Sequence, residues 1–128
     1  MMRIYGIGTD IVEIDRIKRL IKNKILLKRL FDPQEIIKCL KVKNSSNCFA
    51  KRFAAKEAFS KALGTGISQG ISYNEIIVLN QKNRKPYIKL LRKTASAVKK
   101  KIKKKNYKIA LSLSDEKKYA IAFVTISI

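Results

Sequence analysis

Two carboxylates stand where a solvated surface acid is not expected. Asp10 follows small residues in "GIGTDIV", and Glu57 lies among alanines and phenylalanines in "FAAKEAFSKALGTGI". Burial of an unpaired carboxylate is costly, so each group must be protonated, paired with a cation or bound to a metal. Because the chain has 30 Lys and Arg residues and only 9 Asp and Glu residues, an ion pair is the simpler explanation for either carboxylate alone.

Together the two carboxylates favour a hard divalent cation. Mg²⁺ takes one or two protein carboxylates, keeps several waters and accepts phosphate oxygens, so such a site predicts a phosphate-containing substrate. If residues 53–63 are helical, Lys61 lies one turn beyond Glu57 and can direct its ammonium group at the same phosphate. The "GTG" at residues 64–66 either lets backbone N–H groups approach that phosphate or only caps the helix.

The absence of histidine narrows the possible chemistry. No histidine-based triad can form, and Cys39 and Cys48 do not build the usual Cys/His zinc frameworks. Any catalytic base must be a carboxylate, a lysine or a water, and the candidates are Glu57 and a metal-bound water. Two cysteines without a CxxC pattern predict reduced thiols in a cytosolic protein.

The formal net charge of +21 favours polyanionic partners, but it does not identify them. The excess of lysine, isoleucine and asparagine also fits A/T-rich coding. The competing hypothesis is a nucleic-acid-binding protein in which "KKKIKKKN" at residues 99–106 contacts the phosphate backbone. No basic residues interleaved with aromatic residues support this hypothesis. No stretch approaches the roughly 18 uncharged residues of a membrane span, so a soluble, untargeted cytoplasmic protein is expected.

The hydrophobic pattern predicts one α+β domain, residues 1–128, with a largely antiparallel sheet. A first strand is expected at residues 3–12, followed by a basic helix at 13–22. "DPQE" predicts the start of a second helix, because Asp32 can cap it, Glu35 can complete a capping box by accepting from the Asp32 amide, and proline suits the first helical position.

The remaining elements follow in order. Asn47, at the end of a polar loop, is expected to cap the central helix, which carries Glu57 and ends at Gly64. The pattern then predicts two strands, a strongly basic helix and a closing hairpin. They fall at residues 75–80 and 86–90, at 91–106, and at 107–114 with 119–128.

Two segments, "GIGTDIVEIDRI" and "AKRFAAKEAFSKALGTGI", closely resemble the signature motifs of the holo-acyl-carrier-protein synthases, which are small bacterial 4′-phosphopantetheinyl transferases. The resemblance spans nearly the whole chain, with "NRKPYIKL" and the final hairpin in the expected order. Two motifs at this spacing are far more specific than a lone glycine motif. The resemblance implies Mg²⁺-dependent transfer of 4′-phosphopantetheine from coenzyme A to a serine of apo-acyl carrier protein, which leaves adenosine 3′,5′-bisphosphate.

The resemblance also implies roles for particular residues. Asp10 and Glu57 match the magnesium ligands, and Lys61 matches a lysine beside the transferred phosphate. Arg16 matches an arginine on the first helix that meets the acidic carrier protein. Family members are trimers with active sites between neighbouring subunits, so a homotrimer is expected.

Coenzyme A is expected to contact Lys61 and Gly66, with Arg52 and the Lys85-Pro86 turn near its nucleotide part. Two residues depart from the family pattern. Arg84 replaces the usual glycine before the Lys-Pro turn, where positive φ is difficult for arginine. Ala110 replaces a histidine at the start of the penultimate strand. Both changes are expected to affect coenzyme A affinity more than the type of reaction.

Overall fold

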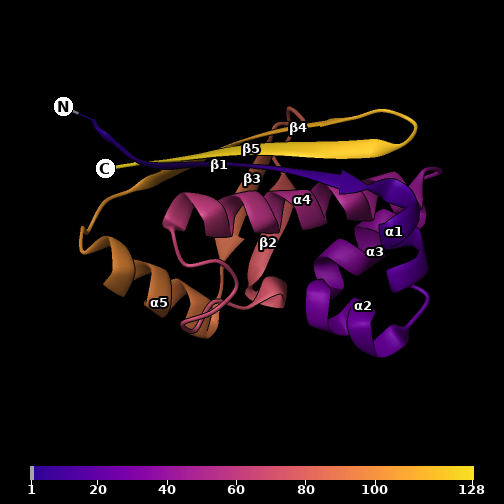
Figure 1. The fold of residues 1–128 in the computed structure, drawn as a ribbon, viewed down its shortest axis with the longest axis horizontal. Helices are drawn as coiled ribbons and strands as arrows, with labels where there is room; N and C mark the ends of the chain where they lie inside the picture. The colour runs from indigo at the N-terminus through magenta and orange to yellow at the C-terminus, as the bar shows by residue number, and fades with distance from the viewer. Residues whose placement is uncertain (1) are drawn as a thin grey trace.

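A long central helix lies against one face of an antiparallel sheet (Figure 1). The computed structural model describes residues 2–128. The helix is α4 (Ser45–Leu63), and the sheet has the order β1-β5-β4, formed by β1 (Ile4–Glu13), β5 (Tyr119–Ser127) and β4 (Lys108–Asp115). A second antiparallel pair contains β2 (Ile76–Asn80) and β3 (Pro86–Leu90). The α+β prediction is confirmed, with two sheets in place of one.

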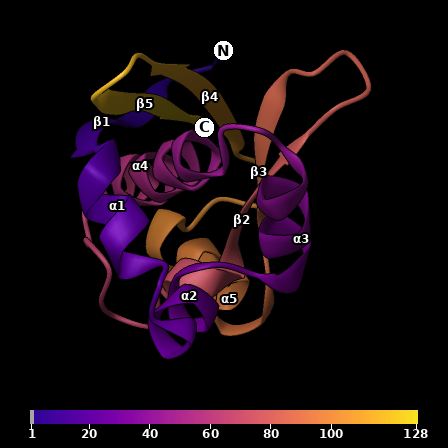
Figure 2. The same ribbon diagram turned by 90° about the vertical axis from the view of Figure 1, so that its right-hand side faces the viewer.

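The other helices lie at the two ends of this layer (Figure 1). Three short helices gather at one end: α1 (Ile14–Leu20), α2 (Lys24–Leu30) and α3 (Pro33–Lys41). At the other end lies α5 (Arg92–Ile102), and the 3₁₀ helix η1 (Tyr73–Glu75) precedes β2. The turn between β2 and β3 projects from the body of the protein (Figure 2). Within the described residues, no helix has both the length and the apolar composition needed to cross a bilayer.

The helix ends differ from the predictions in four places. The first helix is shorter than expected, and α2 was not predicted, although the Asn23 side chain caps it by accepting from the amides of Ile25 and Leu26. Asn44, not Asn47, precedes α4. Asn47 lies inside the first turn of this helix, and its side-chain amide donates to Asp115 Oδ2 at 2.7 Å. The basic run does not continue as a helix, since Lys103 adopts a left-handed conformation that ends α5.

The predicted capping box of α3 is confirmed, and its glutamate has a second role. Glu35 is fully buried, and its Oε1 accepts from Lys56 Nζ at 2.6 Å. Lys56 is also fully buried and donates to the backbone carbonyls of Leu30 and Tyr73 at 2.7 and 2.9 Å. Burial lowers the pKa of Lys56 to about 8, against the opposing effect of the Glu35 charge. This ion pair fastens α3, α4 and η1 to one another.

Two glycines let β1 approach α4 unusually closely. A Cβ atom added to Gly8 would lie 1.9 Å from the carbonyl oxygen of Ala58, and one added to Gly6 would lie 1.8 Å from that of Ala62. Neither distance is possible for a real side chain, so any larger residue must push the strand off the helix. The glycines therefore set the separation between the residues of β1 and those of α4.

We predict that Gly8→Ala lowers the free energy of unfolding by about 1 to 3 kcal/mol, because the added methyl group overpacks the β1–α4 contact. Urea denaturation followed by circular dichroism measures this change. Ser114→Ala, on the exposed face of β4, is the matched control. A Gly8→Ala value within about 0.5 kcal/mol of the wild type would show that the strand separates from the helix at no cost.

Candidate active site

Asp10 and Lys61 meet across the β1–α4 contact. Lys61 Nζ donates to Asp10 Oδ1 at 3.0 Å and to the carbonyl oxygen of Thr9 at 3.1 Å. The Asp10 side chain is 16% exposed and that of Lys61 is 55% exposed, so the pair lies at the surface of the fold. An ammonium group has three N–H donors, so Lys61 retains one for a ligand.

Glu57 lies one turn before Lys61 on α4 and is half-buried. Its Oε1 accepts a hydrogen bond from the Tyr73 hydroxyl of η1. Burial raises the pKa of Tyr73 above its ordinary value. The hydrogen bond to Glu57 and the negative charges of Glu57 and Asp10 raise this pKa further, whereas the positive charge of Arg16 lowers it. Tyr73 is therefore a neutral donor close to both carboxylates. We call Asp10, Glu57, Lys61 and Tyr73 the carboxylate site.

Three members of this site, Asp10, Glu57 and Lys61, are predicted from the sequence, whereas Tyr73 is not. The tyrosine stands in the polar segment "SYNE", which carries no local sign of catalytic chemistry. It reaches Glu57 only through the fold, across 16 positions of sequence.

The donor atoms of the carboxylate site fit a magnesium ion. Within residues 2–128, the side-chain hydrogen bonds of Asp10 and Glu57 engage Oδ1 and Oε1, which leaves Oδ2 and Oε2 for another ligand. The described chain contains no cluster of three or more His, Cys, Asp or Glu residues suited to a metal. A site with two carboxylates suits Mg²⁺, because this ion commonly fills its remaining positions with water and phosphate oxygens.

The glycine turn after α4 caps the helix. Gly64 adopts a left-handed conformation, with φ at 89°. The amides of Gly64, Thr65 and Gly66 all donate to the carbonyl oxygen of Ser60, at 3.0 to 3.3 Å. This geometry is the helix cap that the sequence allowed as one of two explanations. A contact between Gly66 and coenzyme A stays a prediction.

A second feature is a basic cleft of about 1010 Å³ between the start of α4, the β2–β3 turn and β4. Its walls include Arg52, Lys85 and Pro86, so the structure brings together three residues predicted to hold coenzyme A. Further cations line it: Lys38, Lys43, Lys51, Lys82 and Arg84. Asp115 also lines the cleft and pairs with Lys51 at 3.4 Å. The excess of positive charge suits a ligand with several phosphates.

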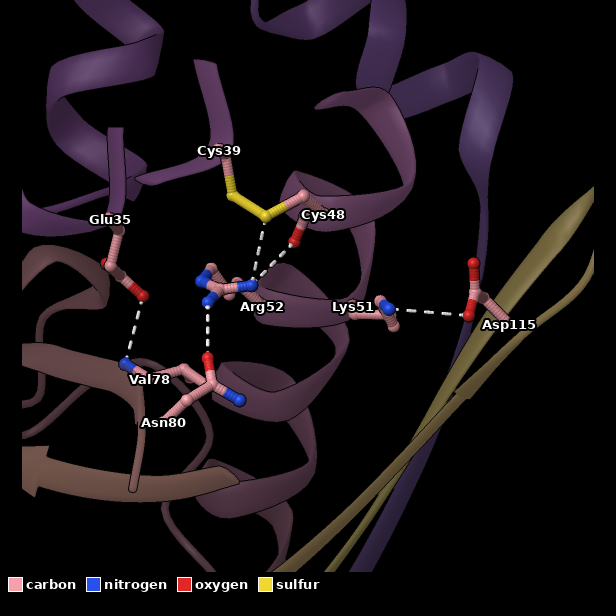
Figure 3. The surroundings of a disulfide bond; sticks show 8 residues. All are labelled: Glu35, Cys39, Cys48, Lys51, Arg52, Val78, Asn80 and Asp115. Atoms are coloured by element: carbon pink, nitrogen blue, oxygen red, sulfur yellow. Dashed lines mark hydrogen bonds and ion pairs between the residues drawn. A yellow bond between two sulfur atoms is a disulfide. The ribbon is translucent and has the colours of Figure 1, made fainter. Parts of the chain in front are cut away.

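Arg52 is buried and lines this cleft, and its guanidinium points toward Asn80 and Cys48 (Figure 3). Its Nη2 donates to Asn80 Oδ1 at 3.2 Å and its Nη1 to the carbonyl oxygen of Cys48 at 3.4 Å. Burial lowers the pKa of Arg52, and the charge of Glu35 opposes this shift. Across residues 2–128, no carboxylate lies within ion-pair distance of the guanidinium, and its buried Nε–H has no acceptor. Arg52 thus places a guanidinium without a directly paired carboxylate, and with one unused N–H, in the wall of the cleft.

The prediction of reduced thiols is wrong for this structure, because Cys39 and Cys48 form a disulfide (Figure 3). The end of α3 and the beginning of α4 pack together, which places the two Cα atoms 5.4 Å apart. That distance is typical of disulfides. The Cys48 sulfur also accepts from Arg52 Nη1 at 3.1 Å.

The two departures from the family pattern both lie in well-formed elements. Arg84 adopts a left-handed conformation with φ at 70°, so the turn takes the positive φ that arginine adopts less easily than glycine. The turn supports it with hydrogen bonds from Arg84 N to Gln81 O and from Gln81 N to Lys85 O, both 2.9 Å. Ala110 lies exposed on β4, opposite Thr125 of β5.

The carboxylate site and the basic cleft lie at opposite edges of the three-stranded sheet. Asp10 belongs to β1, whereas the cleft includes β4, and β5 separates these strands. Arg52 and Glu57 are five residues apart on α4, which places them about 140° apart around the helix axis. The structure thus forms two groups of predicted site residues that are not adjacent in one chain.

Comparison with known proteins agrees with the motifs. The 4′-phosphopantetheinyl transferase superfamily matches residues 6–124. The holo-[acyl-carrier-protein] synthase of Pelagibacter ubique is 46% identical, over 96% of each chain. The crystal structure of the synthase from Neisseria meningitidis superposes with a TM-score of 0.86 at 36% identity, covering 97% of this chain and 98% of that one.

The Helicobacter pylori synthase, solved in complex with coenzyme A, superposes with a TM-score of 0.75 at 33% identity, covering 94% of this chain and 98% of that one. A match of this length in sequence and in structure is specific. The chain belongs to the 4′-phosphopantetheinyl transferase superfamily and, within it, to the holo-acyl-carrier-protein synthases.

Proposed function

We propose that this enzyme transfers 4′-phosphopantetheine from coenzyme A to a serine of an apo-acyl carrier protein, with Mg²⁺ bound by Asp10 and Glu57. The observation that carries the proposal is that Lys61 of α4 contacts Asp10 of β1, while Glu57 lies one turn earlier on the same helix and Tyr73 lies close enough to sense both carboxylates. The binding of coenzyme A by the H. pylori relative supports the choice of substrate.

The reaction exchanges one phosphorus–oxygen bond for another. The serine oxygen bonds to the phosphorus that carries pantetheine, and the bond from that phosphorus to the bridging pyrophosphate oxygen breaks. Adenosine 3′,5′-bisphosphate leaves, and the serine proton passes toward Glu57 or a nearby water. When bound, Mg²⁺ would offset charge on the pyrophosphate oxygens. Lys61 adds a second positive charge through its remaining N–H donor, so catalysis needs positioning and charge neutralisation and no covalent intermediate.

Incubation of apo-acyl carrier protein with coenzyme A, Mg²⁺ and this enzyme, followed by mass spectrometry, tests the proposal directly. The carrier protein should gain the mass of one phosphopantetheine group. Carrier protein whose acceptor serine is replaced by alanine is the control. An unmodified carrier protein at high enzyme concentration would refute the proposed activity.

A homotrimer with shared active sites would unite the two groups of site residues. The sheet face that points away from α4 exposes large apolar side chains, with Ile7 and Ile11 each 61% exposed and Phe123 46% exposed. An apolar patch of this kind is typical of an interface. Packing between copies through this face would bring the carboxylate site at the β1 edge of one subunit toward the basic cleft at the β4 edge of the next.

Mixing two inactive variants tests this sharing of sites. We predict that Asp10→Ala and Arg52→Met are each nearly inactive, because each removes one side of every active site. After the two are unfolded and refolded together, about a quarter of the sites should combine an intact Asp10 with an intact Arg52 from a neighbouring subunit. Separately refolded variants are the control. Absence of recovered activity in mixed oligomers would contradict shared sites.

The metal assignment has its own test. Asp10→Ala and Glu57→Ala should each nearly abolish turnover and Mn²⁺ binding while preserving the fold, because each removes an oxygen ligand from the carboxylate site. Isothermal titration with Mn²⁺ measures binding, and thermal melts report stability. If Asp10 serves only as a structural partner of Lys61, activity in excess chelator should remain complete.

The exposed side of α1 is the proposed docking surface for the carrier protein. Ile14 and Ile17 pack into the core, which leaves the cations of this helix and the turn after it in solvent: Arg16, Lys18, Arg19 and Lys22. The Arg16 charge lowers the pKa of Tyr73, so α1 lies beside the carboxylate site. A positive surface at this place would attract an acidic partner.

Arg16→Glu should raise the KM for carrier protein at least about tenfold and leave the KM for coenzyme A nearly unchanged, because charge reversal repels only the acidic partner. Steady-state kinetics with each substrate varied in turn measures both constants. Lys101→Glu, on the exposed side of α5, is a matched charge-reversal control. Equal changes in both KM values would show that α1 is only a solvated helix face.

A further inference from the structure

Tyr73 is held in place through both its aromatic ring and its backbone. Its ring stacks on Phe53 of α4, with 5.4 Å between ring centroids and 23° between ring planes. Its backbone carbonyl accepts from the buried Lys56 Nζ at 2.9 Å, and Lys56 is itself fixed by Glu35. A tyrosine anchored in this way holds its hydroxyl at a defined point, which here is Glu57 Oε1.

We propose that Tyr73 is a positioning residue for Glu57: its hydroxyl engages Oε1 and orients the carboxylate so that Oε2 can bind the divalent cation. This inference rests on the proposed function, since it assigns Glu57 as a metal ligand. Asp10 is fixed in the corresponding way, because Lys61 engages its Oδ1 and leaves Oδ2 for the cation. Each carboxylate is thus held through one oxygen.

The contacts explain why Glu57 needs such a partner. A glutamate side chain has several rotamers, and ordering it on metal binding carries an entropic cost. Glu57 is only half-buried, and within the described residues the Tyr73 hydroxyl is the one side-chain group that its carboxylate contacts by a hydrogen bond. Partners that orient metal ligands commonly change metal affinity by about 10 to 100-fold when they are removed.

Tyr73→Phe removes the hydroxyl and retains the ring that stacks on Phe53. We predict that it raises the Kd for Mn²⁺ at least about tenfold, measured by electron paramagnetic resonance of free Mn²⁺ with coenzyme A present and carrier protein absent. Tyr107→Phe removes the hydroxyl of another half-buried tyrosine, next to β4, and should leave the Kd unchanged. Circular dichroism confirms that each variant is folded at the temperature of the titration.

A second variant keeps the test decisive if Tyr73→Phe unfolds. Phe53→Leu retains the hydroxyl and removes the aromatic ring that supports it, so it should also weaken Mn²⁺ binding, though less. Wild-type Mn²⁺ affinity in the folded variants would overturn the positioning role while leaving the proposed function intact. If the wild-type enzyme itself bound no Mn²⁺ and still modified carrier protein in excess chelator, the metal assignment would fail, and the positioning role with it.

Discussion

The close contact between β1 and α4 determines where the proposed chemistry of this protein would occur. Gly6 and Gly8 have no side chain, so the strand lies directly on the carbonyl groups of Ala58 and Ala62. This separation lets Lys61 of the helix reach Asp10 and the backbone of Thr9 on the strand. Asp10 and Glu57 can then act together, although they lie 47 positions apart in the sequence. If β1 lay farther from α4, Asp10 and Glu57 could not act together.

A second constraint acts from the other side of α4. The buried Lys56 connects the helix to Glu35 of α3 and to the backbone of Tyr73. Removal of Glu35 or Lys56 would leave the other charge unpaired in an apolar interior. Because Lys56 also donates to the Tyr73 carbonyl, this pair fixes the position of η1. One helix therefore organises the enzyme in several directions: Glu57 and Lys61 serve the carboxylate site, Lys56 anchors the tyrosine that contacts Glu57, and Arg52 lines the basic cleft.

The sequence predicted the parts of the site that follow from local spacing. Glu57 and Lys61 are one helical turn apart, and the capping box at Asp32 and Glu35 depends on neighbouring residues, so both could be read before the fold was known. Tyr73, the disulfide of Cys39 with Cys48, and the pairing of Lys56 with Glu35 arise from packing between elements, which no local pattern encodes. Arg84 shows the same limit, because its turn holds an arginine in a conformation that favours glycine.

In the proposed mechanism, β1 and α4 together form one divalent metal site that serves phosphoryl transfer. A crystal structure of the protein grown with Mn²⁺ and coenzyme A, with data collected near the manganese absorption edge, tests it most directly. The expected result is an anomalous peak for Mn²⁺ within bonding distance of Asp10 Oδ2, Glu57 Oε2 and a pyrophosphate oxygen of coenzyme A. A structure in which coenzyme A is bound, Lys61 still pairs with Asp10, and no anomalous peak lies between the two carboxylates would contradict it.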